Sequence, residues 1–402
     1  MGELSTTERD AVDRAGAEPM LAQVQAWAAV NSGSANLPGL EQVANLLGEA
    51  FSALPGELRL RNPGAVSAVE PDGRVREVAH GRNLHLTVRP DAPVQLLLTG
   101  HMDTVYGADH PFQALRWQDE RTLGGPGVAD MKGGLAVMLA ALKAVEASPL
   151  AQRLGYEVLI NSDEEVGSPG SAALLAEAAR SKRAALTYEP AALPDGTLAG
   201  ARPGSGNFSF VVTGRSAHAG RNPENGRNAV VAAAALALQI DAARREGLSV
   251  NVARVDGGGP NNVVPDGAVL RVNLRPRTQE LQAEAQAAID RAVAEVARAH
   301  DVGIHAHGGF GRPPKPLDAA AEQLFALVAR AGADLGQPIR WQPSGGVCDG
   351  NNIAACGVPV VDTMGVRGGK IHSSEEYLIV DSLPERATLS AVTILRLAEE
   401  AA

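Results

Sequence analysis

The stretch Val94-Gln-Leu-Leu-Leu-Thr-Gly-His101-Met-Asp103 decides how this chain folds. Its continuous apolar run is typical of a strand that is buried on both faces, as in a parallel sheet covered by helices. His101 and Asp103 follow at the carboxyl end of this strand, where open α/β sheets bind their ligands. Residues two apart on an extended segment share a face, so Asp103 can accept a hydrogen bond from His101, the way carboxylates orient metal-binding histidines. The alternative is an ordinary pair of loop residues facing solvent.

Buried strands and helices alternate on both sides of this stretch. The sequence predicts strands at 83–88, 94–99, 156–161, 184–188 and 358–362. It predicts helices at 19–30, 40–54, 133–147, 171–180, 319–333 and 384–401. This alternation predicts an α/β domain in which a mixed sheet is flanked by helices.

A different pattern occupies the middle of the chain. It predicts, in order, strand 207–213, helix 226–246, strands 248–255 and 268–275, helix 279–300 and strand 303–307. This β-α-β-β-α-β order is that of a ferredoxin-like α+β sandwich. The flanking segments ARPGSG and GGFGRPPKP are rich in Gly and Pro, as hinges are. We therefore predict a discontinuous domain of residues 1–203 and 314–402 that carries an inserted domain of residues 204–313.

Composition excludes several classes of partner. The chain has 402 residues and a formal net charge of -10, which argues against nucleic acid as a partner. No window approaches the roughly 20 apolar residues needed to cross a membrane. The two cysteines, Cys348 and Cys356, match no disulfide framework. The chain also begins without an apolar signal-type stretch. We therefore predict a cytoplasmic protein.

Two further segments carry acidic side chains in unusual settings. Asp130 lies in the Gly-rich loop GPGVADMKGG just before a predicted helix, where the alternative role is that of a helix N-cap. Asp163-Glu164-Glu165 follows a buried strand. Crowded like charges repel, and a bound cation or proton would relieve them. The alternative is an acidic first turn of a helix.

Glu189 and His372 complete a set of candidate ligands. Glu189 closes the predicted strand 184–188, and His372 follows a Gly-rich stretch near the end of the chain. With His101, Asp130 and one acid of the 163–165 run, they supply two histidines and three acids. Mixed nitrogen and oxygen ligands of this kind suit zinc, and also cobalt or manganese.

Six motifs occur in one order along the chain: GHMDTV, GPGVADMKGG, NSDEEVGS, YEP, SAHAG and IHS. Together they resemble the di-zinc exopeptidase and deacylase family, which includes glutamate carboxypeptidase, acetylornithine deacetylase, succinyl-diaminopimelate desuccinylase and aminoacylase. The resemblance implies a catalytic di-metal domain and an inserted domain that acts as a lid and dimerisation domain.

The resemblance also implies a ligand set for two Zn²⁺ ions per chain. His101 and Glu189 would bind one ion, Glu165 and His372 the other, and Asp130 would bridge the two. The peptide bond after Asp130 would be cis, as in the family.

Three residues receive catalytic roles from the resemblance. Glu164 would be the general base for a water molecule activated between the two metal ions, and Asp103 would orient His101. His218, in the SAHAG motif, would stabilise the oxyanion, and in dimeric relatives this histidine comes from the partner subunit.

Substrate-binding positions follow from the same resemblance. Asn262, Arg275 and Arg312 lie where relatives hold a substrate carboxylate, and an Arg fork binds carboxylates well. Gly345 and Gly346 match the Gly-rich substrate loop of the family.

The predicted function is hydrolysis of an amide bond next to a free carboxylate, by a homodimeric carboxypeptidase acting on small peptides or N-acyl amino acids. One alternative is a deacylase of N-acyl amino acids with the same metals and base. Another is a non-catalytic peptide-binding relative, which would be expected to lack a ligand or the base.

Overall fold

The strand β5 (Val94–His101) lies inside a six-stranded sheet of the computed structural model, which describes residues 4–399. The sheet has the order β1-β4-β8-β5-β9-β16. Its other strands are β1 (Glu57–Arg61), β4 (Asn83–Val88), β8 (Leu154–Asn161), β9 (Ala184–Thr187) and β16 (Val360–Val361). β8, β5, β9 and β16 run parallel, whereas β4 runs antiparallel to both of its neighbours, β8 and β1, so the sheet is mixed, as predicted.

Helices cover both faces of this sheet. Successive side chains of β5 point to opposite faces, and apolar side chains lie on both faces. Leu96 and Leu98 point into the main core, and Leu97 points into a smaller core on the opposite face. The main core includes residues of α1 (Thr6–Ala17), α2 (Met20–Ala28), α3 (Leu37–Phe51), α4 (Gly133–Glu146), α8 (Ala319–Asp334) and α10 (Ser382–Glu399). The smaller core is closed by α5 (Ala172–Ala178) and α9 (Asp349–Ala355). β5 is thereby buried on both faces.

Short strands complete this larger domain. They are β2 (Val66–Val69) with β3 (Val75–Val78), β10 (Leu198–Ala199) with β15 (Trp341–Gln342), and the sheet of β17 (Gly368–Gly369), β18 (Tyr377–Ile379), β7 (Thr122–Gly124) and β6 (Arg116–Asp119).

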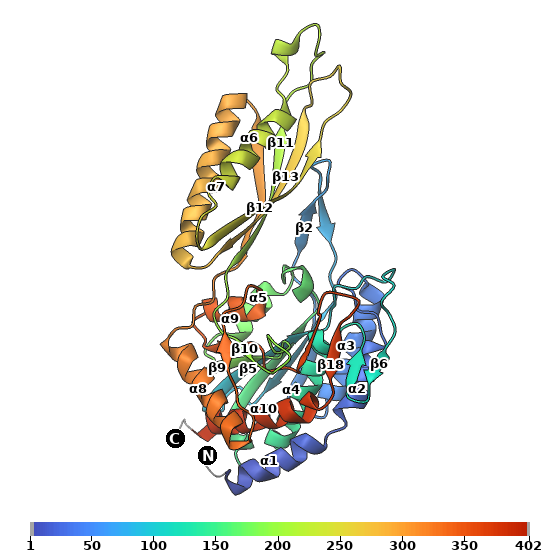
Figure 1. The fold of residues 1–402 in the computed structure, drawn as a ribbon, viewed down its shortest axis with the longest axis vertical. Coiled ribbons are helices and arrows are strands. Elements are labelled where there is room, and N and C mark those ends of the chain that lie inside the picture. The colour runs from blue at the N-terminus through green and yellow to red at the C-terminus, as the bar shows by residue number, and fades with distance from the viewer. Residues whose placement is uncertain (1–3, 400–402) are drawn as a thin grey trace.

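The inserted domain extends away from the larger one (Figure 1). It consists of β11 (Ser205–Thr213), α6 (Ala229–Asp241), β12 (Leu248–Gly257), β13 (Gly267–Pro276), α7 (Gln279–His300) and β14 (Gly303–Arg312). The strands form an antiparallel sheet in the order β12-β13-β11-β14, and side chains of α6 and α7 share one apolar core with it. The predicted fold class, an α/β domain with an inserted ferredoxin-like domain, is confirmed.

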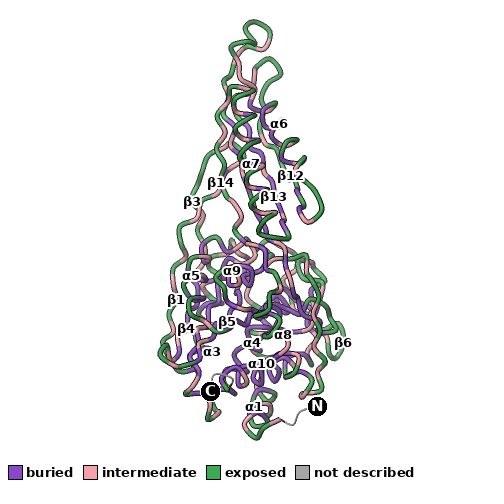
Figure 2. The backbone as a smooth tube through the Cα atoms, turned by 90° about the vertical axis from the view of Figure 1, so that its left-hand side faces the viewer, coloured by how far each residue is buried: buried purple, intermediate pink, exposed green. Residues whose placement is uncertain are grey.

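The chain crosses between the domains twice, and the two crossings lie side by side. The backbones of Arg202 and Lys315 exchange two hydrogen bonds, of 2.9 and 3.0 Å. Both side chains pair with the fully buried carboxylate of Asp362, at 2.8 and 3.0 Å. Figure 2 shows that buried segments concentrate in the larger domain, whereas much of the inserted domain is exposed.

Several predicted boundaries were wrong. Helix 226–246 is shortened to α6, because the side chain of Asn228 caps its start and the helix ends at Asp241, with Ala242 as the C-cap. Helix α1 and the hairpin of β2 and β3 were not predicted as such. The predicted end of the last helix at residue 401 lies outside the described residues. Within residues 4–399, no helix has the length and apolar character that a membrane span requires.

Candidate active site

The five side chains predicted to bind metal converge at the carboxyl edge of the large sheet. His101 ends β5, Glu165 lies in the turn after β8 and Glu189 follows β9. These strands are parallel neighbours, so their carboxyl ends meet at one edge. Asp130 comes from the loop before α4, and His372 comes from the loop between β17 and β18.

Asp130 lies between the two histidines. Its Oδ1 is 3.1 Å from Nε2 of His101, and its Oδ2 is 3.3 Å from Nε2 of His372. Glu189 approaches His101 at 3.8 Å, and Glu165 approaches His372 at 3.1 Å. Each histidine therefore lies beside one glutamate, and Asp130 presents one carboxylate oxygen to each of these two pairs. The peptide bond between Asp130 and Met131 is cis, as the resemblance implied.

The charges of this cluster favour a bound cation. Burial raises the pKa of Glu165 to about 7, and the neighbouring charge of Asp130 adds to this effect. Burial also raises the pKa of Glu189. Hydrogen bonds to Asp130 and Glu165 raise the pKa of His372 to about 11. A set of buried carboxylates with imidazole nitrogens beside them fits a pair of divalent metal ions by the chemistry of its donor atoms.

Asp103 contacts more of the site than the sequence indicated. Nδ1 of His101 is 3.0 Å from the backbone oxygen of Asp103 and 3.3 Å from its carboxylate. The carboxylate accepts hydrogen bonds from the backbone N–H groups of Glu164 and Glu165, at 3.1 and 3.2 Å, and from the hydroxyl of Ser34 at 2.7 Å. Asp103 therefore positions the acidic turn as well as His101.

Glu164, the predicted general base, lies at the border of the cluster. One ligand atom of Glu164 lies within 4.8 Å of ligand atoms of His101 and Glu189. Burial raises the pKa of Glu164 well above its ordinary value, although the nearby charge of Arg312 opposes this effect. A carboxylate held in this way can take up a proton from a water molecule bound beside the cluster.

Arg312, predicted to bind a substrate carboxylate, pairs with two carboxylates of the protein. Its guanidinium lies 2.6 Å from Oε1 of Glu164 and 2.8 Å from Oδ1 of Asp349. Only 4% of its side chain is exposed. The resemblance to the family gave this residue its predicted role, and the structure places it within the hinge segment GGFGRPPKP, beside Glu164.

A cleft of about 1080 Å³ adjoins the cluster and is lined by both domains. Glu164, His372, Arg275 and Gly346 line it. Arg275 donates a hydrogen bond of 3.2 Å to the backbone oxygen of Gly345. Three of the predicted substrate residues, Arg275, Arg312 and Gly346, therefore face the same space as the cluster.

Sequence analysis did not identify a row of polar side chains in this cleft. Asn273 donates hydrogen bonds to Asn207 at 2.8 Å and to Ser205 at 3.1 Å, and all three line the cleft. They alternate along β11 and β13 with apolar core residues. That alternation was the available signal for the face that they occupy.

His218 and Asn262 do not lie beside the cluster of their own chain. They belong to two loops, residues 214–228 and 258–266, that form the end of the inserted domain remote from the larger domain (Figure 1). The backbone N–H of Ala219 donates to the oxygen of Asn262 at 2.9 Å, so these loops are joined. Both residues are exposed, and neither lines the cleft next to the cluster of its own chain.

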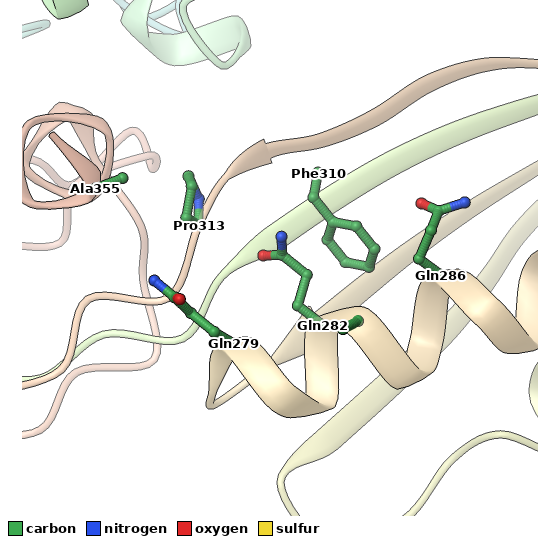
Figure 3. Close-up of a pocket in the computed structure, with 7 residues that line it drawn as sticks. Gln279, Gln282, Gln286, Phe310, Pro313 and Ala355 are labelled. Carbon is green, nitrogen blue, oxygen red and sulfur yellow. The ribbon is translucent and has the colours of Figure 1, made fainter.

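A second cavity, of about 530 Å³, lies at the hinge (Figure 3). Gln279, Gln282 and Gln286 project from α7, with Gln282 beside Phe310 and Gln279 pointing toward Pro313, and Ala355 lies beyond Pro313. Its lining contains no acidic, basic, histidine or cysteine side chain. The cleft beside the histidine–carboxylate cluster therefore remains the candidate active site.

The fold and the histidine–carboxylate cluster define a metal-dependent hydrolase. A model of Peptidase family M20/M25/M40 matches residues 97–396, and the chain belongs to this family. It is 30% identical over 383 residues to carboxypeptidase G2 of Pseudomonas sp. (strain RS-16), covering 92% of this chain and 86% of that protein.

One further relative and one solved structure are similar to this chain. The chain is 28% identical over 282 residues to a succinyl-diaminopimelate desuccinylase of Psychrobacter arcticus, covering 65% of this chain and 67% of that protein. In fold it is similar to the M20 family metallo-carboxypeptidase Sso-CP2 from Sulfolobus solfataricus, with a TM-score of 0.71 and 16% identity over 95% of this chain and 99% of that one.

Proposed function

We propose that this chain is a cytoplasmic carboxypeptidase that hydrolyses the amide bond next to a free carboxylate in small peptides or N-acyl amino acids. The observation that carries the proposal is the position of Asp130, which presents one carboxylate oxygen to each of two histidine–glutamate pairs. The similarity to carboxypeptidase G2 supports the type of reaction. Both cysteines, Cys348 and Cys356, are free thiols, which fits a reducing compartment.

The metal ions in this proposal are two Zn²⁺ ions, with cobalt or manganese as alternatives. In this proposal His101 and Glu189 would hold one ion, His372 and Glu165 would hold the other, and the carboxylate of Asp130 would serve both. When bound, such ions polarise a substrate carbonyl and lower the pKa of a water molecule.

Glu164 acts in this proposal as the general base and then as the general acid. Its carboxylate takes a proton from the attacking water molecule and returns it to the leaving nitrogen. Its raised pKa, caused first by burial, brings it closer to the pKa that a group transferring protons in both directions needs near neutral pH. Asp103 keeps this group in place through the backbone N–H of Glu164.

The substrate carboxylate binds in the cleft on the side of the inserted domain. Arg275 lines the cleft with part of its guanidinium directed at the loop of Gly345 and Gly346. Arg312 supplies further positive charge at the border with Glu164. We propose that Asn262 also contacts the substrate carboxylate. Because Asn262 lies at the end of the inserted domain, this contact requires that end of an inserted domain to approach the cleft.

A homodimer explains why His218 is remote from the cluster of its own chain. Helix α6 exposes Val231 and Leu238, at 51% and 74%, and these residues lie seven positions apart on one face. Beside it, β12 is an edge strand of the sheet. Pairing through this apolar face and edge would let the loop of His218 from one subunit reach the cleft of the other, where His218 donates to the oxyanion.

The alternative function is a deacylase of N-acyl amino acids. The similarity to succinyl-diaminopimelate desuccinylases supports it, since these names describe removal of an acyl group from an amino acid. A panel of dipeptides and N-acyl amino acids, tested with metal-reconstituted protein, separates the two. Faster hydrolysis of peptides supports the carboxypeptidase, faster hydrolysis of acyl amino acids supports the deacylase, and no hydrolysis of either would contradict both.

A further inference from the structure

Glu376 is a buried residue whose carboxylate accepts hydrogen bonds from the loop of Asp130. It is 1% exposed and lies just before β18. Its Oε1 accepts hydrogen bonds from the backbone N–H groups of Ala129 and Asp130, at 3.0 and 3.1 Å. Its Oε2 accepts from the N–H of Gly127 at 3.2 Å and lies 2.9 Å from the hydroxyl of Tyr106. Three backbone donors of one loop therefore converge on a single side chain.

Tyr106 connects this arrangement to the two loops that carry the histidines. It follows His101 by five residues and is 2% exposed. Its hydroxyl is 2.8 Å from the backbone oxygen of Ser373, the residue after His372. Its ring packs edge-on against Phe112, with the centroids 5.1 Å apart. The Tyr106–Glu376 pair thus contacts the loops of His101, Asp130 and His372.

Burying the carboxylate of Glu376 costs free energy, so packing alone does not explain its position. A buried carboxylate destabilises a fold unless donors and cations compensate it. Here the backbone donors belong to the loop that presents Asp130, and the buried Lys132 at the end of that loop interacts electrostatically with Glu376. The compensation is therefore concentrated on the segment that must hold Asp130 in a bridging orientation.

His372 depends most on this support. Its side chain is 55% exposed, whereas that of His101 is 1% exposed, so packing alone holds His372 weakly. The contact between Tyr106 and the oxygen of Ser373 fixes the backbone next to it.

We propose that Glu376, with Tyr106, is a positioning residue of the two-metal centre. It fixes the loop of Asp130 so that each carboxylate oxygen faces one histidine, and it ties the loop of His372 to that of His101. This inference rests on the proposed two-zinc function. Outer contacts that orient ligands in this way typically change metal affinity by about 10–100-fold when removed.

The neighbouring Glu375 offers a matched control. Its side chain is 74% exposed and pairs with Lys370 at 3.2 Å. Glu375→Gln removes the same charge one residue away without touching the loop of Asp130. Glu376→Gln keeps the shape of the side chain but places an amide N–H₂ against N–H donors.

The test is zinc affinity measured by competition with a chromophoric chelator, using metal-free wild-type protein and the variants Glu376→Gln, Glu375→Gln and Tyr106→Phe. We expect zinc affinity to fall by about 10–100-fold in Glu376→Gln, by about tenfold in Tyr106→Phe, and to stay unchanged in Glu375→Gln. The absorption spectrum of the cobalt-loaded protein should change in Glu376→Gln and stay unchanged in Glu375→Gln.

Urea unfolding of the metal-free proteins separates positioning from simple stabilisation. A lower free energy of unfolding in Glu376→Gln with wild-type zinc affinity of the folded protein would overturn the inference. If Glu376→Gln does not fold, unchanged zinc affinity in Tyr106→Phe would overturn it instead. Failure of the wild-type protein to bind zinc would contradict the two-zinc function as well, so the two failures are distinguishable.

Discussion

The two domains place their chemically active side chains in opposite environments. In the larger domain, His101 and Asp103 are 1% and 0% exposed and contact residues of the same domain. In the inserted domain, the core is apolar, and His218 and Asn262 lie in exposed loops remote from the cluster. The five side chains of the cluster therefore all come from the larger domain, whereas the roles proposed for His218 and Asn262 depend on a second subunit.

The largest effect is expected for the base in the larger domain. Glu164→Ala should lower kcat by about 10²–10⁴-fold, because it removes the proton acceptor. Zinc content should stay at the wild-type value, since Glu164 is not one of the five proposed ligands. Metal analysis beside steady-state kinetics checks both points, and wild-type turnover in the variant would rule out the assigned role.

The buried hinge pairing should matter for stability rather than chemistry. Asp362→Asn leaves Arg202 and Lys315 without their shared carboxylate, which should cost about 3–5 kcal/mol of unfolding free energy. Asp381→Asn removes the exposed pairing with Arg121 and should cost less than about 1 kcal/mol. Urea unfolding of both variants gives the comparison. Equal small losses would show that the hinge pairing contributes little.

The pH dependence of this effect has a defined sign. Burial alone would raise the pKa of Asp362. The positive charges of Arg202 and Lys315 lower it by more than burial raises it, so the pKa lies below the ordinary value of 3.8. A carboxyl group whose pKa is lower in the folded state stabilises the fold above its unfolded pKa and loses that contribution as pH falls. The difference between wild type and Asp362→Asn should therefore be constant near neutral pH and shrink only in acid.

A smaller loss of rate is expected for the loop of the inserted domain. His218→Ala should lower kcat by about 10²–10³-fold, as loss of an oxyanion donor does. If the histidine acts on the partner subunit, mixing this variant with Glu164→Ala should restore about a quarter of wild-type activity, because half of the dimers are mixed and each has one intact site. No recovery in a verified mixed dimer would restrict His218 to its own chain.

The smallest effect is expected for recognition in the cleft. Arg275→Met should lower kcat/KM by about 10–100-fold on a substrate with a free carboxylate and much less on the corresponding amide. Arg277→Met, an exposed arginine two residues further along, is the matched control. Equal losses on acid and amide would argue against a carboxylate contact by Arg275.

Sequence patterns predicted elements best where signals agree locally. Helix α7 has the predicted bounds, since Thr278 caps its start, Asp301 ends it in a left-handed conformation, and its buried residues recur at helical spacing. Helix α1 was missed although Ser5 and Glu8 form a capping box, because it is polar and buries small side chains such as Ala11 and Ala15. The hairpin of β2 and β3 was missed because its strands are mostly exposed and lack a clear alternation.

Sequence patterns also predicted some residues of the candidate site and not others. The residues that end buried strands, such as His101 and Glu189, could be selected because strand ends meet at one edge of a sheet. Glu376 could not be separated from Glu375, since neighbouring acids in a loop carry no mark of which one is buried. The pairing of Arg312 with Glu164 spans 148 residues and depends on how the hinge returns to the larger domain.

The sequence by itself determined the kind of donor atoms, their order along the chain and the strands that carry them, because these depend on local composition and spacing. Only the tertiary structure decided that the two oxygens of Asp130 face different histidines, that Glu376 holds the loop of Asp130, and that His218 lies remote from the cluster of its own chain. Side-chain direction and contacts between distant segments depend on packing of the whole chain, which no local pattern encodes.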